Sequence, residues 1–339
     1  MASRKKKSST TRRTRKSRQS WWAWLGRLAI VSILLWLGIY AWHDWERLLQ
    51  IVAKGWDKAT QTAPPPRDNA PTEPTPPKQD GKPSTTTAPN LKVASWNIAH
   101  FGSSKDDQEI AFIADVIKDY DLVALQEVSV EDAGARAVAR LSDELNRKGN
   151  KWTYTVSSPT SGEGCERYAF IWKTRKVTLH KNAWLATGKN IDQLIDREPY
   201  LARFSVENRT LTVANFHAVP STKNPANEAR LLDDLHRLYD KDNLVIAGDF
   251  NLAQHDPAFD ELKKYGYAPV LTKQKTSLRR TVEPSGNYLS QEYDNIFIES
   301  LHFTLVRSGI NDFVPKAKSL KNANNISDHL PVWCEIRLR

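Results

Sequence analysis

Cysteine is scarce in this chain of 339 residues, which contains only Cys165 and Cys334. Two cysteines cannot form the disulfide framework on which small secreted folds depend, and no cluster of Cys and His has the spacing of a zinc site. We predict that both cysteines remain free, although export would permit a bridge between them. The fold must therefore rest on apolar packing, for which the length is ample.

Net charge is absent from the C-terminal part of the chain, although the whole chain is formally +10. Residues 1–90 contain 16 Lys and Arg against 6 Asp and Glu, whereas residues 91–339 contain 33 of each. The basic excess does not show that the C-terminal part binds nucleic acid. Residues 1–20 hold nine Lys or Arg without an apolar pattern, which predicts a disordered tail. We interpret this tail as a topology signal in preference to a nucleic-acid-binding arm.

One long apolar run, residues 21–42, contains a single charge, Arg27, and has tryptophans at both ends. About 20 apolar residues suffice to cross a bilayer as a helix, and such tryptophans are typical interfacial anchors. We predict a single-pass transmembrane helix, with residues 1–20 cytoplasmic and the chain after about residue 43 extracytoplasmic, either periplasmic or extracellular. A cleaved signal peptide is the competing interpretation, but no A-x-A-like site closes the run. A buried core helix is the other alternative, but hydrophobicity on all sides over 22 residues is excessive for a soluble domain.

The segment 43–90 is predicted to connect the membrane to a folded domain. Its first part, up to residue 58, has the pattern of a short amphipathic helix. Residues 59–90 contain nine prolines and almost no apolar residues, so they cannot build a core and favour extended polyproline II. We predict a semi-rigid linker that holds the domain away from the membrane.

Residues 91–339 have the pattern of a single α/β domain without internal repeats. Three amphipathic segments predict helices, DQEIAFIADVIKDY, DAGARAVARLSDELNRK and NEARLLDDLHRLYD. Seven apolar runs predict strands: LKVASWNIAHF, LVALQEV, YAFIWK, LTVANFHAV, NLVIAGDFNLA, YDNIFIE and LPVWCEIRL. This mixture predicts helices packed outside a sheet core.

Polar residues recur at the ends of these predicted strands, where a buried apolar run gives no reason for them. A single Asn, Glu or His at such a position is usually a cap or turn residue. If the strands run so that their polar ends converge, however, the groups line one cleft. The residues concerned are Asn97, Glu127, His217, Asp249, Asn251, Asp294, Asp328 and His329.

Eight motifs, in this order, resemble those of the endonuclease/exonuclease/phosphatase superfamily: SWNIAHFG, LQEV, ERYAFIWK, REPYLARF, NFHAVP, GDFN, YDNIFI and SDHLPV. The resemblance covers residues 91–339 and is strongest to the deoxyribonuclease I branch, through REPYLARF and HAVP…EARLLDDLHRLYD. It implies a four-layered α/β sandwich, two packed sheets with helices outside, and divalent-metal-dependent phosphodiester hydrolysis.

A phosphodiester resists attack because its oxygens are anionic, so its hydrolysis needs a cation, a base and an acid. We predict that Glu127, Asp328 and Asn97 bind Mg²⁺, which prefers oxygen ligands. Mn²⁺ is an alternative, and Ca²⁺ sites are left open. Asp249 and Asn251 are predicted to complete the cation and phosphate environment.

His217 and His329 are the predicted proton carriers, because imidazole titrates near neutral pH. By resemblance to the family, Glu166 orients His217 and Asp294 orients His329, and which ring is the acid is left open. Arg197 is the predicted clamp for the scissile phosphate, since a guanidinium can contact two oxygens. The basic loop KQKTSLRRT, residues 273–281, is either a further phosphate contact or a solvated loop.

Two positions depart from the deoxyribonuclease I pattern. That branch has an arginine just after its QEV motif, used in the DNA minor groove, where this chain has Ser129. The minor-groove aromatic residue of the branch corresponds to Gly164. Both changes leave the hydrolytic residues in place but argue against binding of double-stranded DNA.

The sequence therefore predicts a membrane-anchored, metal-dependent nuclease acting on DNA. A phosphoesterase acting on lipid or phosphoinositide head groups and a catalytically inactive binding module of the same fold are the alternatives. The complete set of polar strand-end residues argues against the inactive module. The sequence does not determine the oligomeric state.

Overall fold

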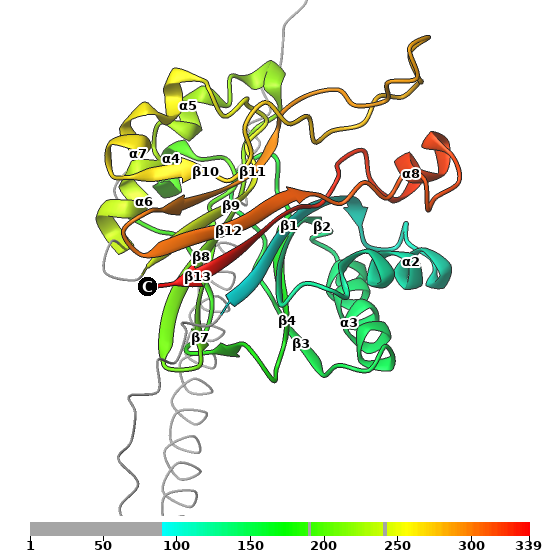
Figure 1. Cartoon of the computed structure of the whole chain (residues 1–339), viewed down its shortest axis with the longest axis horizontal. Helices are drawn as coiled ribbons and strands as arrows, with labels where there is room; N and C mark the ends of the chain where they lie inside the picture. The colour runs from blue at the N-terminus through cyan, green and yellow to red at the C-terminus, as the bar shows by residue number, and fades with distance from the viewer. Residues whose placement is uncertain (1–89, 189–190, 240–242) are drawn as a thin grey trace, which may run out of the picture. The chain divides into compact units, whose positions relative to one another are not determined.

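Two β-sheets pack face to face in the computed structural model, which describes residues 90–188, 191–239 and 243–339 (Figure 1). The predicted basic tail, the transmembrane helix over residues 21–42 and almost all of the linker lie outside the described residues, so they remain predictions. Within the described part of the chain, no helix is long and apolar enough to cross a membrane.

The first sheet has six strands and contains both the N-terminal and the C-terminal strand of the described domain. Its order is β12 (Phe303–Ile310), β13 (Val332–Leu338), β1 (Asn90–Phe101), β2 (Leu122–Val128), β4 (Arg167–Lys173) and β3 (Trp152–Val156). Only β1 and β2 run parallel, and the antiparallel strand β13 lies between β12 and β1. A parallel pair needs a crossover connection, which helix α2 (Asp107–Ile117) provides.

The second sheet repeats this plan with one parallel pair, β8 (Arg209–His217) and β9 (Leu244–Asp249). Antiparallel strands flank the pair on both sides: β11 (Asp294–Glu299) and β10 (Tyr267–Pro269) beyond β9, then β7 (Tyr200–Val206) and β5 (Thr178–Leu179) beyond β8, with β6 (Trp184–Leu185) also on β7. The crossover from β8 to β9 carries α5 (Ala226–Ala229) and α6 (Leu232–Tyr239).

Three apolar clusters separate the four layers. The middle cluster joins the inner faces of both sheets through residues such as Val93, Ala124 and Val245. The two outer clusters hold helices against the outer faces. Helices α2, α3 (Asp132–Arg147) and α8 (Leu320–Ile326) cover the first sheet, while α4 (Ile191–Leu194), α5, α6 and α7 (Asp260–Lys264) cover the second.

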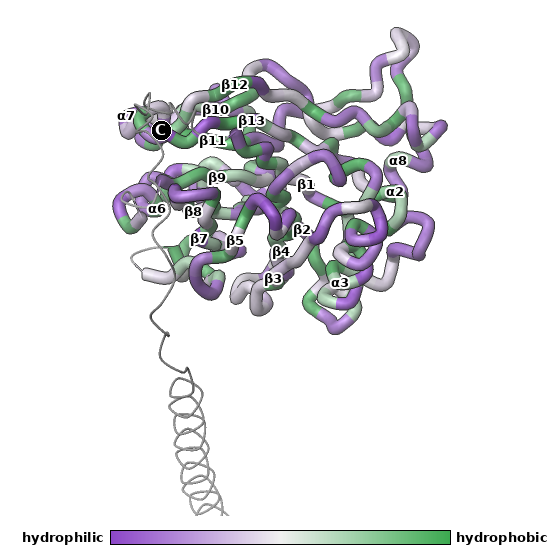
Figure 2. The backbone as a smooth tube through the Cα atoms, turned by 60° about the horizontal axis from the view of Figure 1, so that its bottom comes forward, coloured by the Kyte–Doolittle hydropathy of each residue, from purple (hydrophilic) through white to green (hydrophobic). Residues whose placement is uncertain are grey.

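Side-chain alternation along the strands produces these layers. In β2, Leu122 and Ala124 point to the middle cluster, while Val123 and Leu125 point to the helices. Because both faces are covered, the central strands are apolar throughout, and Figure 2 shows apolar stretches along them and hydrophilic ones in the connecting loops. The predicted arrangement of two packed sheets flanked by helices is confirmed.

The seven predicted strands are all present, and one predicted helix is broken. The segment NEARLLDDLHRLYD forms two short helices, α5 and α6, interrupted after Ala229. Strand β7 lies in REPYLARF, which was recognised as a motif and not as a strand. Cys165 and Cys334 are both free, as predicted.

Candidate active site

Strand registers bring the predicted polar residues to one end of the two sheets. In the second sheet, Asp249 at the end of β9 lies opposite His217 at the end of β8 and opposite Asp294 at the start of β11. In the first sheet, Asn97 of β1 lies opposite Gln126, which precedes Glu127. The parallel pairs β1–β2 and β8–β9 therefore present their C-terminal ends to a common site.

Local backbone distortions aim several of these side chains. The register of β1 with β2 shifts between Asn97 and Phe101, and that of β2 with β4 shifts after Leu125. Within or beside these irregularities, His100 and Glu127 have left-handed backbone conformations, with φ of 51° and 58°. Such conformations cost non-glycine residues about 1–3 kcal/mol and persist where the surrounding structure enforces them. The strain therefore lies at the candidate site.

His217 is oriented by Glu166, as predicted. The His217 Nδ1 atom lies 2.9 Å and 3.1 Å from the two carboxylate oxygens of Glu166, and both side chains are buried. Burial opposes protonation of His217, but Glu166 and, more weakly, Asp249 outweigh it and raise the pKa of the ring. The carboxylate fixes the ring so that Nε2 faces the interior of the site.

His329 is oriented by Asp294 in the same way. Its Nδ1 lies 2.8 Å from Asp294 Oδ2, an atom that also accepts a hydrogen bond of 2.6 Å from the Thr276 hydroxyl. Burial opposes the charge on His329, but the carboxylates of Asp294 and Asp249 raise the pKa of the ring well above its ordinary value. These carboxylates therefore favour the protonated form of His329.

Asp249 lies between the two rings. Its Oδ2 atom is 3.5 Å from His217 Nε2 and 3.6 Å from His329 Nε2, and it accepts a 3.1 Å hydrogen bond from Asn97 Nδ2. Burial alone would raise the pKa of Asp249, but the two imidazoles and the hydrogen bonds hold it below its ordinary value. The other oxygen, Oδ1, accepts from the backbone N–H of Asn251 at 2.9 Å.

The residues next to Asp249 offer oxygen ligands for a hard cation. Glu127 accepts from Asn97 Nδ2 at 3.1 Å and from the His100 backbone N–H at 3.0 Å. Burial opposes its charge, but His217 and these hydrogen bonds lower its pKa, so Glu127 is a carboxylate. Asn97 Oδ1 is buried and has no hydrogen-bond partner among the described residues. An ionised carboxylate beside a free amide oxygen suits Mg²⁺ or Mn²⁺.

A second acidic group also has the spacing of a cation site. Asp249, Asp294 and His329 each offer one ligand atom, and these atoms lie within 4.8 Å of one another. However, a metal-binding imidazole must be neutral, and the carboxylates around His329 favour its protonated form. The same carboxylates would also attract a cation, so a proton on His329 and a metal ion would compete at this group, whereas Glu127 and Asn97 offer oxygen ligands without such competition.

Asp328 and Arg197 lie at the edge of this cluster: Arg197 Nη1 is 3.8 Å from Glu166 Oε2, and the charge of Asp328 helps to raise the pKa of His329. Asp328 is exposed, on the loop before β13. The Arg197 side chain is only 6% exposed and donates hydrogen bonds to the backbone carbonyls of His217, Ala218 and Gly164. These contacts place Arg197 beneath His217, and the phosphate contact predicted for it stays a prediction. Asn251 also contacts the Ala218 carbonyl, through Nδ2 at 3.1 Å.

Sequence inspection missed several buried residues that support the site. Lys105 is 4% exposed, and its Nζ donates a 2.7 Å hydrogen bond to the Asn325 carbonyl, near the end of α8. Burial lowers the pKa of Lys105, opposed by Glu109, Glu127 and Asp328. A lysine within the polar sequence GSSKDD gave no signal of burial, because only the tertiary fold covers it.

A polar bridge between the sheets lies directly below the site. Gln126 Nε2 contacts Ser95 Oγ at 3.0 Å and Asn215 Oδ1 at 2.5 Å. Asn215 in turn donates to the carbonyls of Leu125 at 3.0 Å and Ala169 at 3.2 Å. These hydrogen bonds join strand β2 of the first sheet to strand β8 of the second, although Gln126 Oε1 is buried without a hydrogen-bond partner among the described residues.

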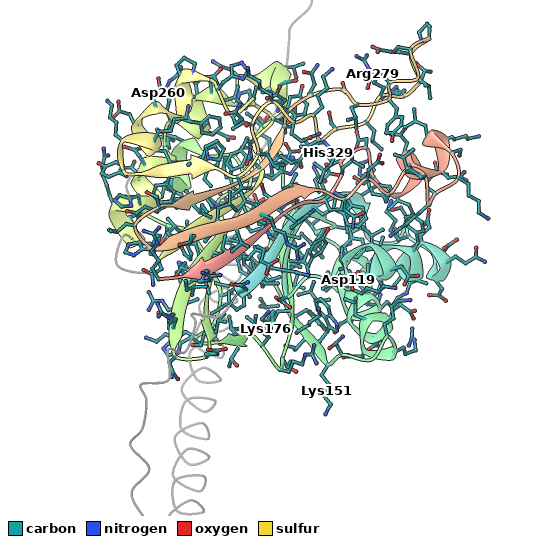
Figure 3. The ribbon with its side chains drawn as sticks, viewed as in Figure 1. Asp119, Lys151, Lys176, Asp260, Arg279 and His329 are labelled. Atoms are coloured by element: carbon teal, nitrogen blue, oxygen red, sulfur yellow. The ribbon has the colours of Figure 1, made fainter. Side chains whose placement is uncertain are left out.

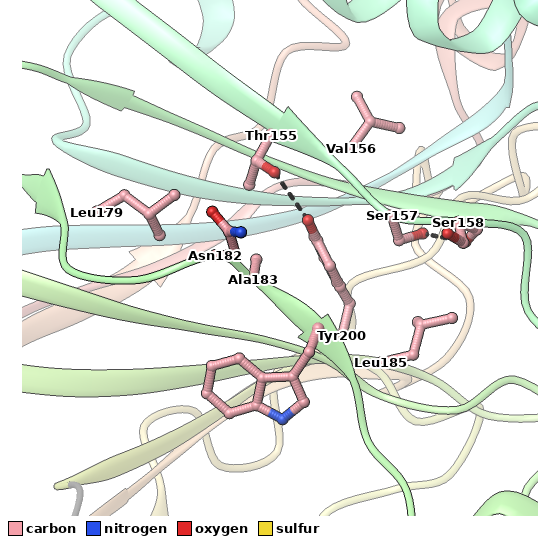
Figure 4. A pocket seen from close by; sticks show the side chains of 10 residues that line it. Thr155, Val156, Ser157, Ser158, Leu179, Asn182, Ala183, Leu185 and Tyr200 are labelled. Atoms are coloured by element: carbon pink, nitrogen blue, oxygen red, sulfur yellow. Dashed lines mark hydrogen bonds between the residues drawn. The ribbon is translucent and has the colours of Figure 1, made fainter. Parts of the chain in front are cut away.

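A cavity of about 510 Å³ adjoins the site on the Glu127 side. Its lining includes the buried Glu166 and Arg197, the half-buried Glu127 and Ser129, and the exposed Glu131. Another cavity, of about 400 Å³, lies beside strands β3, β6 and β7, where Thr155 Oγ and Tyr200 OH are 2.8 Å apart (Figure 4). It contains no predicted site residue.

Two imidazoles, each oriented by its own carboxylate and both facing a third carboxylate beside cation ligands, define a hydrolase site of the acid–base class. Residues 94–329 match the Endonuclease/Exonuclease/phosphatase family, and the chain belongs to this family. The predicted resemblance is thereby confirmed, and the chain is a nuclease or phosphodiesterase of this superfamily.

Comparisons with individual proteins agree. The chain is 26% identical to "Deoxyribonuclease-1" of Oryctolagus cuniculus over 275 residues, which cover 72% of this chain and 92% of the relative. It is also 26% identical to a "Deoxyribonuclease" of Thioalkalivibrio sp. (strain K90mix), covering 72% and 70% of the two chains. The crystal structure of an endonuclease/exonuclease/phosphatase from Bacteroides vulgatus has the same fold, with a TM-score of 0.56, 17% identity and coverage of 74% and 100%.

Proposed function

We propose that this chain is a metal-dependent phosphodiesterase that cleaves DNA, held at a membrane by residues 21–42 with its catalytic domain extracytoplasmic. The observation that carries the catalytic proposal is the convergence of His217 and His329 on Asp249, next to Glu127. The relatives named as deoxyribonucleases support DNA as the substrate. The apolar run and basic tail support the location.

Glu127 and Asn97 would hold the cation, with Asp328 as the remaining predicted ligand. The cation would supply charge neutralisation at the scissile phosphate. The oxygen of Asn97 is free for this purpose, because its amide nitrogen is occupied by Glu127 and Asp249.

The two histidines divide the proton transfers. A water molecule attacks phosphorus, the bond from phosphorus to the leaving oxygen breaks, and one proton must leave the water while another reaches the leaving oxygen. His329 is the donor in this scheme, because two carboxylates hold its ring protonated. His217 is the acceptor, with Glu166 stabilising the imidazolium that forms. Asp249 keeps both Nε2 atoms directed into the site.

The test uses the full-length chain purified in detergent. Plasmid DNA, single-stranded DNA, RNA and phosphoinositides are each incubated with Mg²⁺ or with EDTA, and the products are quantified. We expect Mg²⁺-dependent cleavage of DNA, and a variant carrying both His217→Ala and His329→Ala controls for contaminating nucleases. Turnover of phosphoinositides alone would replace DNA with a lipid substrate. No turnover of any substrate would refute the enzymatic proposal.

The membrane location has its own test. A protease added to intact spheroplasts should degrade the catalytic domain and spare residues 1–20, because the positive-inside rule places these residues in the cytoplasm. Protection of the domain in sealed cells, with degradation after lysis, would contradict this orientation.

A further inference from the structure

An extended arm, residues 272–293, connects β10 to β11 and projects from the body next to α8 (Figure 1). Its base is bonded to the catalytic segment. Ser277 pairs with His329 as an isolated β-bridge, and the Leu278 N–H donates to the Asp328 carbonyl at 2.6 Å. The Thr276 hydroxyl contacts Asp294, as described above. The arm therefore begins at the proton-transfer residues and leads outward.

The arm carries unneutralised positive charge. Lys273 and Arg280 are exposed and Lys275 is half-buried, and none of the three is in a salt bridge with a described residue. Arg279 Nη2 lies 2.6 Å from Glu283 Oε1, and Arg279 is labelled on the arm in Figure 3. The two acidic residues of the arm, Glu283 and Glu292, follow these cations in the sequence, so the arm has two more basic than acidic side chains.

The neighbouring segment before and within α8 extends this basic surface. Lys316, Lys318 and Lys321 are exposed, and residues 313–327 include no acidic residue. The Asn324 side chain joins the segment to the arm by donating to the Arg279 carbonyl at 3.0 Å. We call Lys273, Lys275, Arg280 and these three lysines the basic surface.

The opposite side of the site has the reverse charge. The 510 Å³ cavity is lined by the carboxylates of Glu127, Glu131 and Glu166. Glu127 is the proposed cation ligand, and Glu166 is paired with His217 and lies 3.8 Å from Arg197. The exposed Glu131 is therefore the carboxylate left without a partner role in the site. Asp132, the next residue after Glu131, is also exposed. Its carboxylate lies 3.8 Å from the guanidinium of Arg136. Unpaired exposed cations of the described residues thus gather on the arm side of the catalytic residues, whereas Arg136 and Lys223 on the other side each lie next to a carboxylate.

We propose that the strand being cut runs from His329 along the basic surface, and that the site takes single-stranded nucleic acid in preference to a duplex. This inference rests on the proposed function. A duplex would place its second backbone on the carboxylate side, where repulsion opposes binding. A single strand needs cations along one path, which the basic surface supplies.

The test uses two double variants. The first, Lys275→Glu and Arg280→Glu, reverses the charge of the arm, and the second, Lys151→Glu and Arg175→Glu, is the matched control. The control pair is exposed and consists of the same residue types. Lys151 lies just before β3 and Arg175 just after β4, at the strand ends opposite to Glu166. Each full-length protein is assayed on a single-stranded DNA oligonucleotide, on the same sequence as a duplex, and on bis(p-nitrophenyl) phosphate, a diester that has no flanking phosphates.

We expect the wild-type protein to cleave the single strand faster than the duplex. Reversing the arm should lower kcat/KM for the single strand at least tenfold. It should also reduce the slope of log kcat/KM against log salt by about 1.4, because single strands lose about 0.7 per phosphate contact. Hydrolysis of the small diester should change less than twofold, and the control pair should leave all three substrates within twofold.

A second variant tests the acidic side. Glu131→Lys should raise duplex cleavage relative to single-strand cleavage severalfold, because it places a cation where the second backbone would lie. Wild-type preference for the duplex, an unchanged single-strand rate in the arm variant, or an equal loss on the small diester would overturn the inference. Absence of hydrolysis of all three substrates by the wild-type protein would instead refute the proposed function.

Discussion

Replacement of Asp249 by Asn removes one charge from the centre of the site and little volume. The Asp249 carboxylate lies 3.5 Å and 3.6 Å from the two imidazole Nε2 atoms, and its side chain is only 1% exposed. At an effective dielectric constant of 20, a charge pair at this distance interacts with about 4–5 kcal/mol before desolvation is subtracted. One pKa unit corresponds to about 1.4 kcal/mol, so even a third of this interaction moves each histidine by about one unit.

The direction in which the pH–rate profile should move follows from the direction of the pKa shifts. Asp249 contributes to the raised pKa values of both His217 and His329. Without its charge, the imidazolium that must donate a proton is lost at lower pH. The falling limb of the pH–rate profile should therefore move to lower pH by at least about one unit. The plateau rate should fall by about 10²-fold or more, because neither ring is held as before.

The assay measures kcat between pH 5 and pH 10 with bis(p-nitrophenyl) phosphate, and thermal unfolding shows whether the variant is folded. Asp119→Asn is the matched control, since Asp119 is exposed and far from His329 in Figure 3. If folded Asp249→Asn protein kept the wild-type pH profile and a rate within twofold, the placement of Asp249 between two proton carriers would be refuted.

Three further predictions concern the metal and the proton carriers. Glu127→Gln should raise the half-saturating Mg²⁺ concentration and lower the rate without unfolding the domain, and an unchanged Mg²⁺ titration would remove Glu127 from the cation site. His217→Ala and His329→Ala should each lower kcat by about 10²-fold or more. The double variant should lose far less activity than the product of the two single losses. A double variant with the full product of the losses would show that the two rings act independently. Lys105→Met should tighten Mg²⁺ binding severalfold, because a buried cation near Glu127 and Asp328 is removed. Weaker Mg²⁺ binding would instead assign Lys105 a purely structural role in holding α8. Lys173→Met, which replaces another buried lysine, is the control.

The sequence predicted the strands and their polar ends well, because strand periodicity and site chemistry are local properties. Asn97, Glu127, His217, Asp249 and Asp294 are each unusual for the end of a buried apolar strand, and each lies at the site.

Properties that depend on distant partners could not be predicted in this way. The burial of Lys105 depends on a carbonyl 220 residues away, and the role of Asn215 depends on carbonyls in the other sheet. Arg197 illustrates the same limit, because its sequence context suggests a phosphate ligand whereas its observed partners are backbone carbonyls beneath His217.

The central position of β13 has a consequence for when activity arises during synthesis. Among the described strands β13 is synthesised last, yet it lies between β12 and β1. The segment just before it carries His329, whose carbonyl accepts a hydrogen bond of 2.8 Å from Trp96 Nε1, and Ser327, whose hydroxyl contacts the Asn97 carbonyl. Contacts across more than 200 residues form late in folding. A nascent chain that has emerged only as far as residue 325 therefore lacks both a complete first sheet and His329, so its candidate site cannot yet be assembled.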